Sequence, residues 1–108
     1  MQKCRLKSSF DFKKTSKMGC RLNTPHFLVF TLFNNLEYNR LGVTASRKVG
    51  NSVKRNRIKR LLRECFRNEI NNYICSTDIV IIAKKNINKI DYDLVFRELN
   101  FAKNKAKS

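Results

Sequence analysis

A dense run of cationic side chains is the part of this sequence best suited to chemistry with an anionic partner. It extends from Arg47 to Arg67, RKVGNSVKRNRIKRLLRECFR, and Glu64 is the only acid within it. Arginine binds a phosphate through two parallel hydrogen bonds, and lysine supplies a point charge. Like charges packed so closely repel one another unless phosphates lie between them. The residues that we expect to contact an anionic partner are Lys54, Arg55, Asn56, Arg57, Lys59, Arg60 and Arg63.

Residues that could support catalysis by the protein itself are scattered. A nuclease needs carboxylates for Mg²⁺ or an acid–base pair centred on histidine. Asp78, Asp91 and Asp93 fall near the expected ends of elements, and His26, the only histidine, has no obvious partner in the sequence. The cysteines include no C-x-x-C pair, so we expect no zinc site. Because the carboxylates and the histidine are scattered, we also expect no catalytic residue in the protein. The four cysteines, predicted to be free thiols, are Cys4, Cys20, Cys65 and Cys75.

The composition indicates one basic domain, residues 1–108. Lys and Arg total 24 against 8 acidic residues, a formal net charge of +16, and 42% of the residues are hydrophobic. Such an excess of charge favours an anionic partner, which could be nucleic acid, a membrane surface or an acidic protein. No apolar run approaches the roughly 20 residues that span a bilayer, and the first residues do not resemble a signal peptide. We therefore expect a cytoplasmic protein that does not bind membranes.

Hydrophobic periodicity predicts an α+β fold with the order α-β-β-α-β-α and room for one further short strand. The strand at 78–83, DIVIIA, is continuously apolar and should be buried on both faces. Asn51 or Ser52 should cap the central helix, and Asp91 the last one. The expected elements are a helix at 9–18, strands at 26–32 and 41–46, a helix from 51 to about 71, a strand at 78–83, a helix from 91, and a frayed tail at 103–108.

The central helix separates an apolar stripe from a cationic side. Ile58, Leu61, Leu62, Cys65, Phe66 and Ile70 recur at helical spacing on one stripe. Asn56, Arg60, Arg63 and Arg67 fall on the opposite side. If the stripe covers a sheet, the cations face solvent. A free basic amphipathic helix that binds membranes or calmodulin-like targets is therefore disfavoured, because its apolar stripe would have to be unoccupied.

The segment from Lys48 to Glu64, KVGNSVKRNRIKRLLRE, resembles the signature of the bacterial ribonuclease P protein family. The shared core is Arg-Asn-Arg, followed by Ile-Lys-Arg and a further Arg-Glu. The strand 40–43, the segment 78–83 and Arg5-Leu6 before Phe12 also match in the right order. The resemblance implies a small, mostly antiparallel sheet packed by helices, like the second domain of ribosomal protein S5. It also implies a left-handed β-α-β crossover around the basic helix, where general rules favour the right hand.

The resemblance implies a role in tRNA 5′ maturation as the non-catalytic subunit of a ribonucleoprotein endoribonuclease. In that family the RNA subunit hydrolyses the phosphodiester with Mg²⁺, and the protein binds that RNA and the 5′ leader of precursor tRNA. We thus expect one protein per RNA subunit, no cofactor bound by the protein itself, and Mg²⁺ only through the RNA. Carried over by residue, the contacts to the RNA subunit would be Lys54, Arg55, Asn56, Arg57, Lys59, Arg60 and Arg63. The leader cleft would be formed by Phe12, Phe30, Arg47, Lys48, Asn56 and Arg63.

Cleft aromatics would stack on the bases of single-stranded RNA. Without the resemblance, Phe12 and Phe30 would be assigned to the core; with it, we expect exposure in the cleft. Ser16 departs from the family, which often has a second helix aromatic there, so leader contacts are expected to be weaker unless Phe10 substitutes. The alternative function is a ribosomal or general RNA-binding protein, for which charge and helix would fit equally well.

Overall fold

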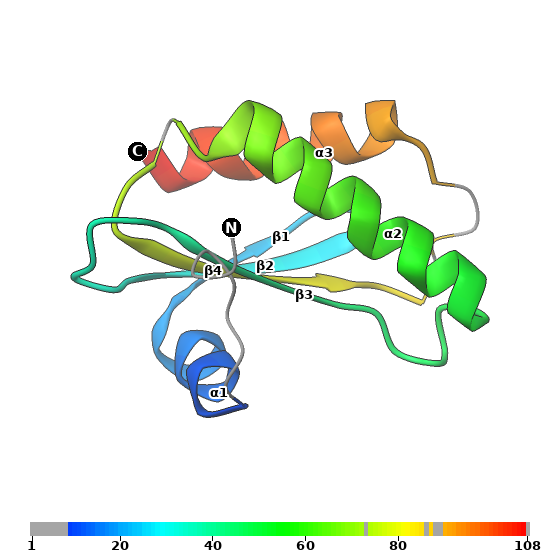
Figure 1. Ribbon diagram of the computed structural model, residues 1–108, viewed down its shortest axis with the longest axis horizontal. Helices are drawn as coiled ribbons and strands as arrows, with labels where there is room; N and C mark the ends of the chain where they lie inside the picture. The colour runs from blue at the N-terminus through cyan, green and yellow to red at the C-terminus, as the bar shows by residue number, and fades with distance from the viewer. Residues whose placement is uncertain (1–8, 73, 86, 88–89, 108) are drawn as a thin grey trace.

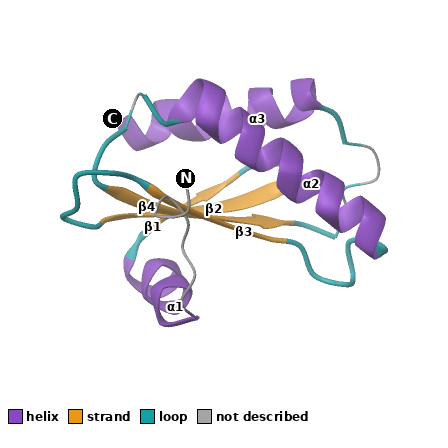
Figure 2. Cartoon of the chain, in the orientation of Figure 1, coloured by secondary structure: helices purple, strands orange, loops and turns teal. Residues whose placement is uncertain are grey.

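The chain folds into a four-stranded sheet with helices on both of its faces (Figure 1). The structure, a computed structural model, describes residues 9–72, 74–85, 87 and 90–107, and for 9–12, 16 and 105–107 it describes the backbone alone. Helices α2 and α3 lie on one face of the sheet and α1 lies on the other (Figure 2). The elements are α1 (Ser9–Met18), β1 (Cys20–Asn23), β2 (Phe27–Phe33), β3 (Arg40–Thr44), α2 (Ser52–Cys65), the π-helical turn η2 (Phe66–Ile70), β4 (Thr77–Ala83) and α3 (Tyr92–Lys107).

The strand order is β1-β2-β4-β3, so β4 is central, as its continuous apolar run predicts. It pairs antiparallel with β2 and parallel with β3. The parallel pair is joined through α2, which forms the expected strand–helix–strand unit around the basic helix. The mixed α+β class is therefore confirmed, while the left hand of the connection stays a prediction.

The further short strand is β1, an edge strand that pairs antiparallel with β2. No alternation of apolar residues marks CRLN, and only Leu22 packs against the main core. The chain reaches β1 from α1 through Gly19, whose backbone lies against β2. A Cβ on Gly19 would lie 2.4 Å from the carbonyl oxygen of Thr31 and 2.6 Å from that of Thr15. Glycine at this position therefore lets α1 dock closely on the sheet.

The main core lies between the sheet and the α2–α3 layer. Phe27 and Ile81 from the sheet, Ile58 and Leu62 from α2, and Val95 from α3 are all buried there. Alternate residues of β2 and β4 form a smaller cluster on the other face of the sheet. Burying apolar surface on both faces stabilises β4 as the centre of the fold, at about 25 cal/mol for each Å² removed from water.

The helix ends follow the expected caps. Asn51 Oδ1 accepts a hydrogen bond from the backbone N–H of Lys54 at 2.9 Å, and Asp91 Oδ1 accepts one from Leu94 at 2.9 Å. Helical structure after α2 continues through η2 and ends at Ile70, close to the predicted end. Helix α3 extends to Lys107, through residues expected to be frayed, because its stripe continues inward with the buried Ala102.

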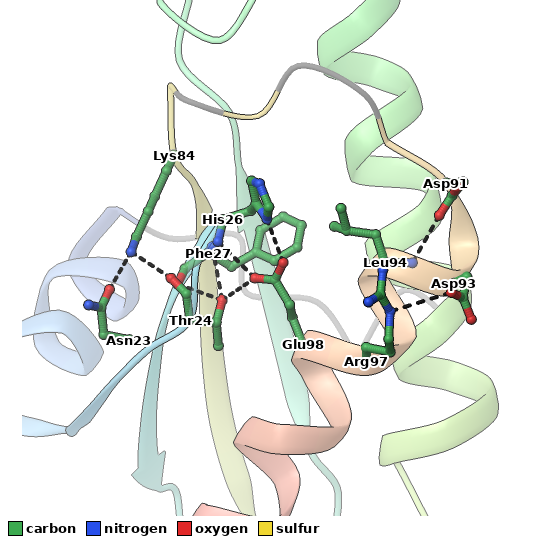
Figure 3. A network of polar contacts seen from close by, with 10 residues as sticks. All are labelled: Asn23, Thr24, His26, Phe27, Lys84, Asp91, Asp93, Leu94, Arg97 and Glu98. Carbon is green, nitrogen blue, oxygen red and sulfur yellow. Dashed lines mark hydrogen bonds and ion pairs between the residues drawn. The ribbon is translucent and has the colours of Figure 1, made fainter.

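Glu98 of α3 ties that helix to the turn between β1 and β2 (Figure 3). Its carboxylate accepts hydrogen bonds from Thr24 Oγ1 at 2.5 Å and from the His26 backbone N–H at 2.8 Å, and it contacts His26 Nδ1 at 2.6 Å. The lone histidine thus has a partner that the sequence did not reveal. Since Glu98 lies 72 residues from His26 along the chain, only the fold brings them together.

Candidate nucleic-acid interface

The cationic side of α2 faces solvent while its apolar stripe covers the sheet. Ile58, Leu62 and Cys65 are buried, and the first turn contains no acidic residue. Asn56 and Arg60 are exposed. Among the described residues, the cations of α2 that have no ion pair are Lys54, Arg55, Arg57, Lys59 and Arg60. Their charge is therefore not neutralised within this part of the protein.

The cations of α2 lie on two flanks that differ in how they are held. Arg57 Nη2 donates to the backbone carbonyl of Ile90 at 3.4 Å, so this flank faces the segment that leads into α3. Arg55, Lys59 and Arg63 are spaced by four residues and therefore share the other flank. Arg55 Nε donates to the carbonyl of Gly50 at 3.2 Å, which fixes its guanidinium beside the start of the helix.

Arg47 and Lys48 lie between β3 and α2, and both are exposed. A turn closed by the hydrogen bond from Val49 N–H to the Ser46 carbonyl, 3.0 Å long, presents them to solvent while Val49 itself is buried. The structure thus places Arg47 and Lys48 in the segment that leads into the N-terminal end of the cationic helix.

Phe30 lies on the other face of the sheet, the face on which α1 packs. It clusters there with Val80, Leu28 and Ile82, and only 8% of its surface is exposed. The expected exposure is therefore wrong for Phe30 in this structure, because its ring packs among the side chains of the neighbouring strand residues in this cluster. The side chains of Phe12 and Ser16, and of Phe10, lie outside the described residues.

One row of paired residues crosses this second face from strand to strand. Gly42 pairs with Val80, Val80 with Phe30, and Phe30 with Arg21 of β1. Directly opposed residues of neighbouring strands point to the same side of a sheet. Arg21 is exposed and was not among the predicted contact residues. No sequence pattern marks the pairing that places it beside Phe30.

The carboxylates considered for catalysis have structural partners. Arg40 binds Asp78 through two hydrogen bonds, Nε to Oδ1 at 2.8 Å and Nη2 to Oδ2 at 2.6 Å. Asp91 caps α3, and Asp93 forms an exposed ion pair with Arg97 at 3.4 Å. In the described part of the chain, no three His, Cys, Asp or Glu side chains gather as a metal site would require. No helix among these residues has the length and apolar character to cross a membrane.

A cationic, acid-poor helix that covers one face of a small mixed sheet defines a nucleic-acid-binding protein of the α+β class. The family model for ribonuclease P matches residues 1–107. The ribonuclease P protein component of Syntrophus aciditrophicus is 45% identical over 105 residues, covering 92% of this chain and 88% of that protein. The chain belongs to the ribonuclease P protein family.

Solved structures of the family share the fold. The ribonuclease P protein of Staphylococcus aureus superposes with a TM-score of 0.87 at 32% identity, covering 96% of this chain and 95% of that one. The protein of Thermotoga maritima, in complex with 1-(4-fluorophenyl)-2-thiourea, gives a TM-score of 0.83 at 35% identity, with 92% and 97% covered. The resemblance carried by the Arg-Asn-Arg segment is thereby confirmed, and the ribosomal or general RNA-binding alternative is not supported.

Proposed function

We propose that this chain acts as the non-catalytic protein subunit of ribonuclease P, in the cytoplasm, with one protein bound to each RNA subunit. It binds the catalytic RNA and the 5′ leader of precursor tRNA and assists the endonucleolytic removal of that leader. The observation that carries the proposal is the cationic side of α2, which has no acidic counterpart in its first turn. Such a surface gains free energy when its cations replace the counterions condensed on RNA, which are released into solution.

The RNA subunit binds along α2. Arg60 and Asn56 project into solvent, Lys59 is half-buried, and Arg55 is held in place by Gly50. A guanidinium fixed before binding loses less conformational freedom when it meets a phosphate. Asn56 adds a neutral donor and acceptor for a ribose hydroxyl or a base edge. The remaining members of this proposed surface are Lys54, Arg57 and Arg63.

The leader crosses the face of the sheet that carries Phe30. Here Phe30 acts as part of an apolar floor with the half-buried Leu28 and Ile82, and Phe12 is proposed to meet the leader from α1. Arg47, Lys48, Asn56 and Arg63 supply polar and cationic contacts at the β3 side of this path. Aromatic side chains that stack on bases contribute about 1–3 kcal/mol for each base.

The hydrolysis itself requires no group from this protein. The phosphodiester is cut by the RNA subunit with Mg²⁺, which binds through the RNA, and no cofactor is assigned to the protein. The protein's part is electrostatic. The RNA subunit and the precursor are both polyanions, and the protein lowers the repulsion between them. Without the protein, only dissolved cations could offset that repulsion.

Binding measurements test the two surfaces separately. Arg60→Ala should weaken binding of the RNA subunit alone, whereas Phe30→Leu should leave it unchanged and weaken binding of precursors with a leader of several nucleotides. Arg97→Ala, which removes an exposed arginine from α3, is the matched control. Equal effects of Arg60→Ala and Arg97→Ala on the RNA subunit would contradict the proposed role of α2.

A further inference from the structure

We infer that Lys13 and Lys17 of α1, with Arg21 of β1, form a second cationic surface that binds leader phosphates upstream of the nucleotides lying against Phe30. We call these three residues the α1–β1 track. The inference rests on the proposed function, because it extends the path of the leader. It adds a contact surface on the side of the sheet opposite α2.

The sheet register sets the start of the track. Gly42, Val80, Phe30 and Arg21 form one row across β3, β4, β2 and β1. Neighbouring strands lie about 4.8 Å apart, so this row spans roughly 14 Å. A single strand that enters at β3 and crosses Phe30 therefore leaves the sheet over β1, where Arg21 is the next side chain in the row and is exposed.

The orientation of α1 continues the track beyond the sheet. Thr15 is fully buried, so its side of α1 faces the sheet. Lys13 and Lys17 are two residues before and after Thr15, which places them on the opposite side, one turn apart, and both are exposed. Arg21 follows Lys17 by four residues, so their Cα atoms are at most about 14 Å apart even for an extended chain.

Charge identifies the partner as a polyanion. Lysines at i and i+4 on one side of a helix repel each other, and among the described residues Lys13, Lys17 and Arg21 have no ion pair. The first 36 residues of the sequence contain one acid, Asp11, against seven cations: Lys3, Arg5, Lys7, Lys13, Lys14, Lys17 and Arg21. Because α1 and α2 lie on opposite faces of the sheet (Figure 1), RNA bound along α2 does not neutralise this charge.

Two precursor tRNAs test the inference, one with a leader of a few nucleotides and one with a leader several times longer. Both are bound to the complex of RNA subunit and protein with Ca²⁺ in place of Mg²⁺, so that cleavage is slow during the binding measurement. The variants are Lys17→Gln, Arg21→Gln and the triple variant that adds Lys13→Gln. Arg97→Gln removes one exposed charge from α3 and serves as the matched control for each single variant.

The triple variant should weaken binding of the long leader and leave the short leader and the RNA subunit unaffected. For the long leader, the slope of log K against log salt should become shallower by about 0.7 for each lost phosphate contact, or about 2 in total. Equal losses for both leaders, or losses equal to those of Arg97→Gln, would overturn the track but keep the proposed function. A wild-type complex that binds both precursors equally would overturn the track alone, because a leader of a few nucleotides still reaches Phe30.

Discussion

The arginines of α2 differ in what holds them, and this difference predicts which ones act mainly on RNA. Arg57 donates to the backbone carbonyl of Ile90, so its replacement also removes a contact between α2 and the segment before α3. Arg60 is exposed and, in the described part of the chain, has no ion pair. Mutation of Arg60 therefore reports on binding with little effect on the fold.

We expect Arg60→Ala to weaken binding of the ribonuclease P RNA about tenfold, since a charge-assisted hydrogen bond contributes roughly 1.5 kcal/mol. The slope of log K against log salt should become shallower by about 1, as for one lost phosphate contact. A filter-binding titration at several salt concentrations measures both quantities. An unchanged slope would mean that Arg60 does not contact a phosphate.

Cys65 is the last residue of α2, and its thiol is buried in the core. Burial raises the pKa of this thiol from 9.0 to about 11. Between these values the unfolded chain has lost the thiol proton and the native protein retains it. The native state then binds more protons, so the free energy of unfolding should fall as pH rises from about 9 to about 11. Urea unfolding of wild type and Cys65→Ala across this range measures the effect, and an equal pH dependence in both would contradict it.

At the scale of elements, the contact of α1 with β2 depends on Gly19. A methyl group there would lie within 2.6 Å of two backbone oxygens, those of Thr31 and Thr15, which cannot move aside as a flexible side chain could. We expect Gly19→Ala to lower the free energy of unfolding by about 1–3 kcal/mol, as overpacking does. It should also weaken leader binding, because α1 borders the leader face. Urea unfolding and the binding assay with the long leader check the two effects, and unchanged values would show that α1 does not depend on this close approach.

Elements with a strong local pattern could be predicted from the sequence. The α1 boundaries, the Asn51 and Asp91 caps and the central place of β4 followed from capping residues and apolar runs. The ribonuclease P fold class followed from the motif at 48–64. Strand β1 could not be placed, because its four residues carry no alternating pattern and it is defined by pairing with β2.

Contacts between distant residues were beyond sequence reasoning. The His26–Glu98 and Arg40–Asp78 pairs join residues 72 and 38 positions apart, and only the packed sheet brings them within hydrogen-bonding distance. The exposure of Phe30 was wrongly expected for the same reason: a family motif indicates a surface, but the neighbours of one ring depend on the local packing. Arg21 was missed because only the strand register puts it next to Phe30.

At the scale of the whole molecule, the net charge of +16 should make stability depend on anions. A ligand that binds only the native state stabilises it according to its concentration. We expect a short single-stranded RNA to raise the melting temperature at low ionic strength by about 4–8 °C for each kcal/mol of binding free energy. Circular dichroism at matched ionic strength, with sodium chloride in place of RNA, is the control. Equal stabilisation by chloride would indicate general screening without bound phosphates.

We propose that this protein assists a catalytic RNA in removing the leader of precursor tRNA. Cleavage of precursor tRNA by a bacterial ribonuclease P RNA at low Mg²⁺ tests this role, with and without the protein, for leaders of one and of several nucleotides. We predict that the protein stimulates cleavage, and more strongly for the longer leader. Tight binding of RNA without any stimulation would contradict the claim.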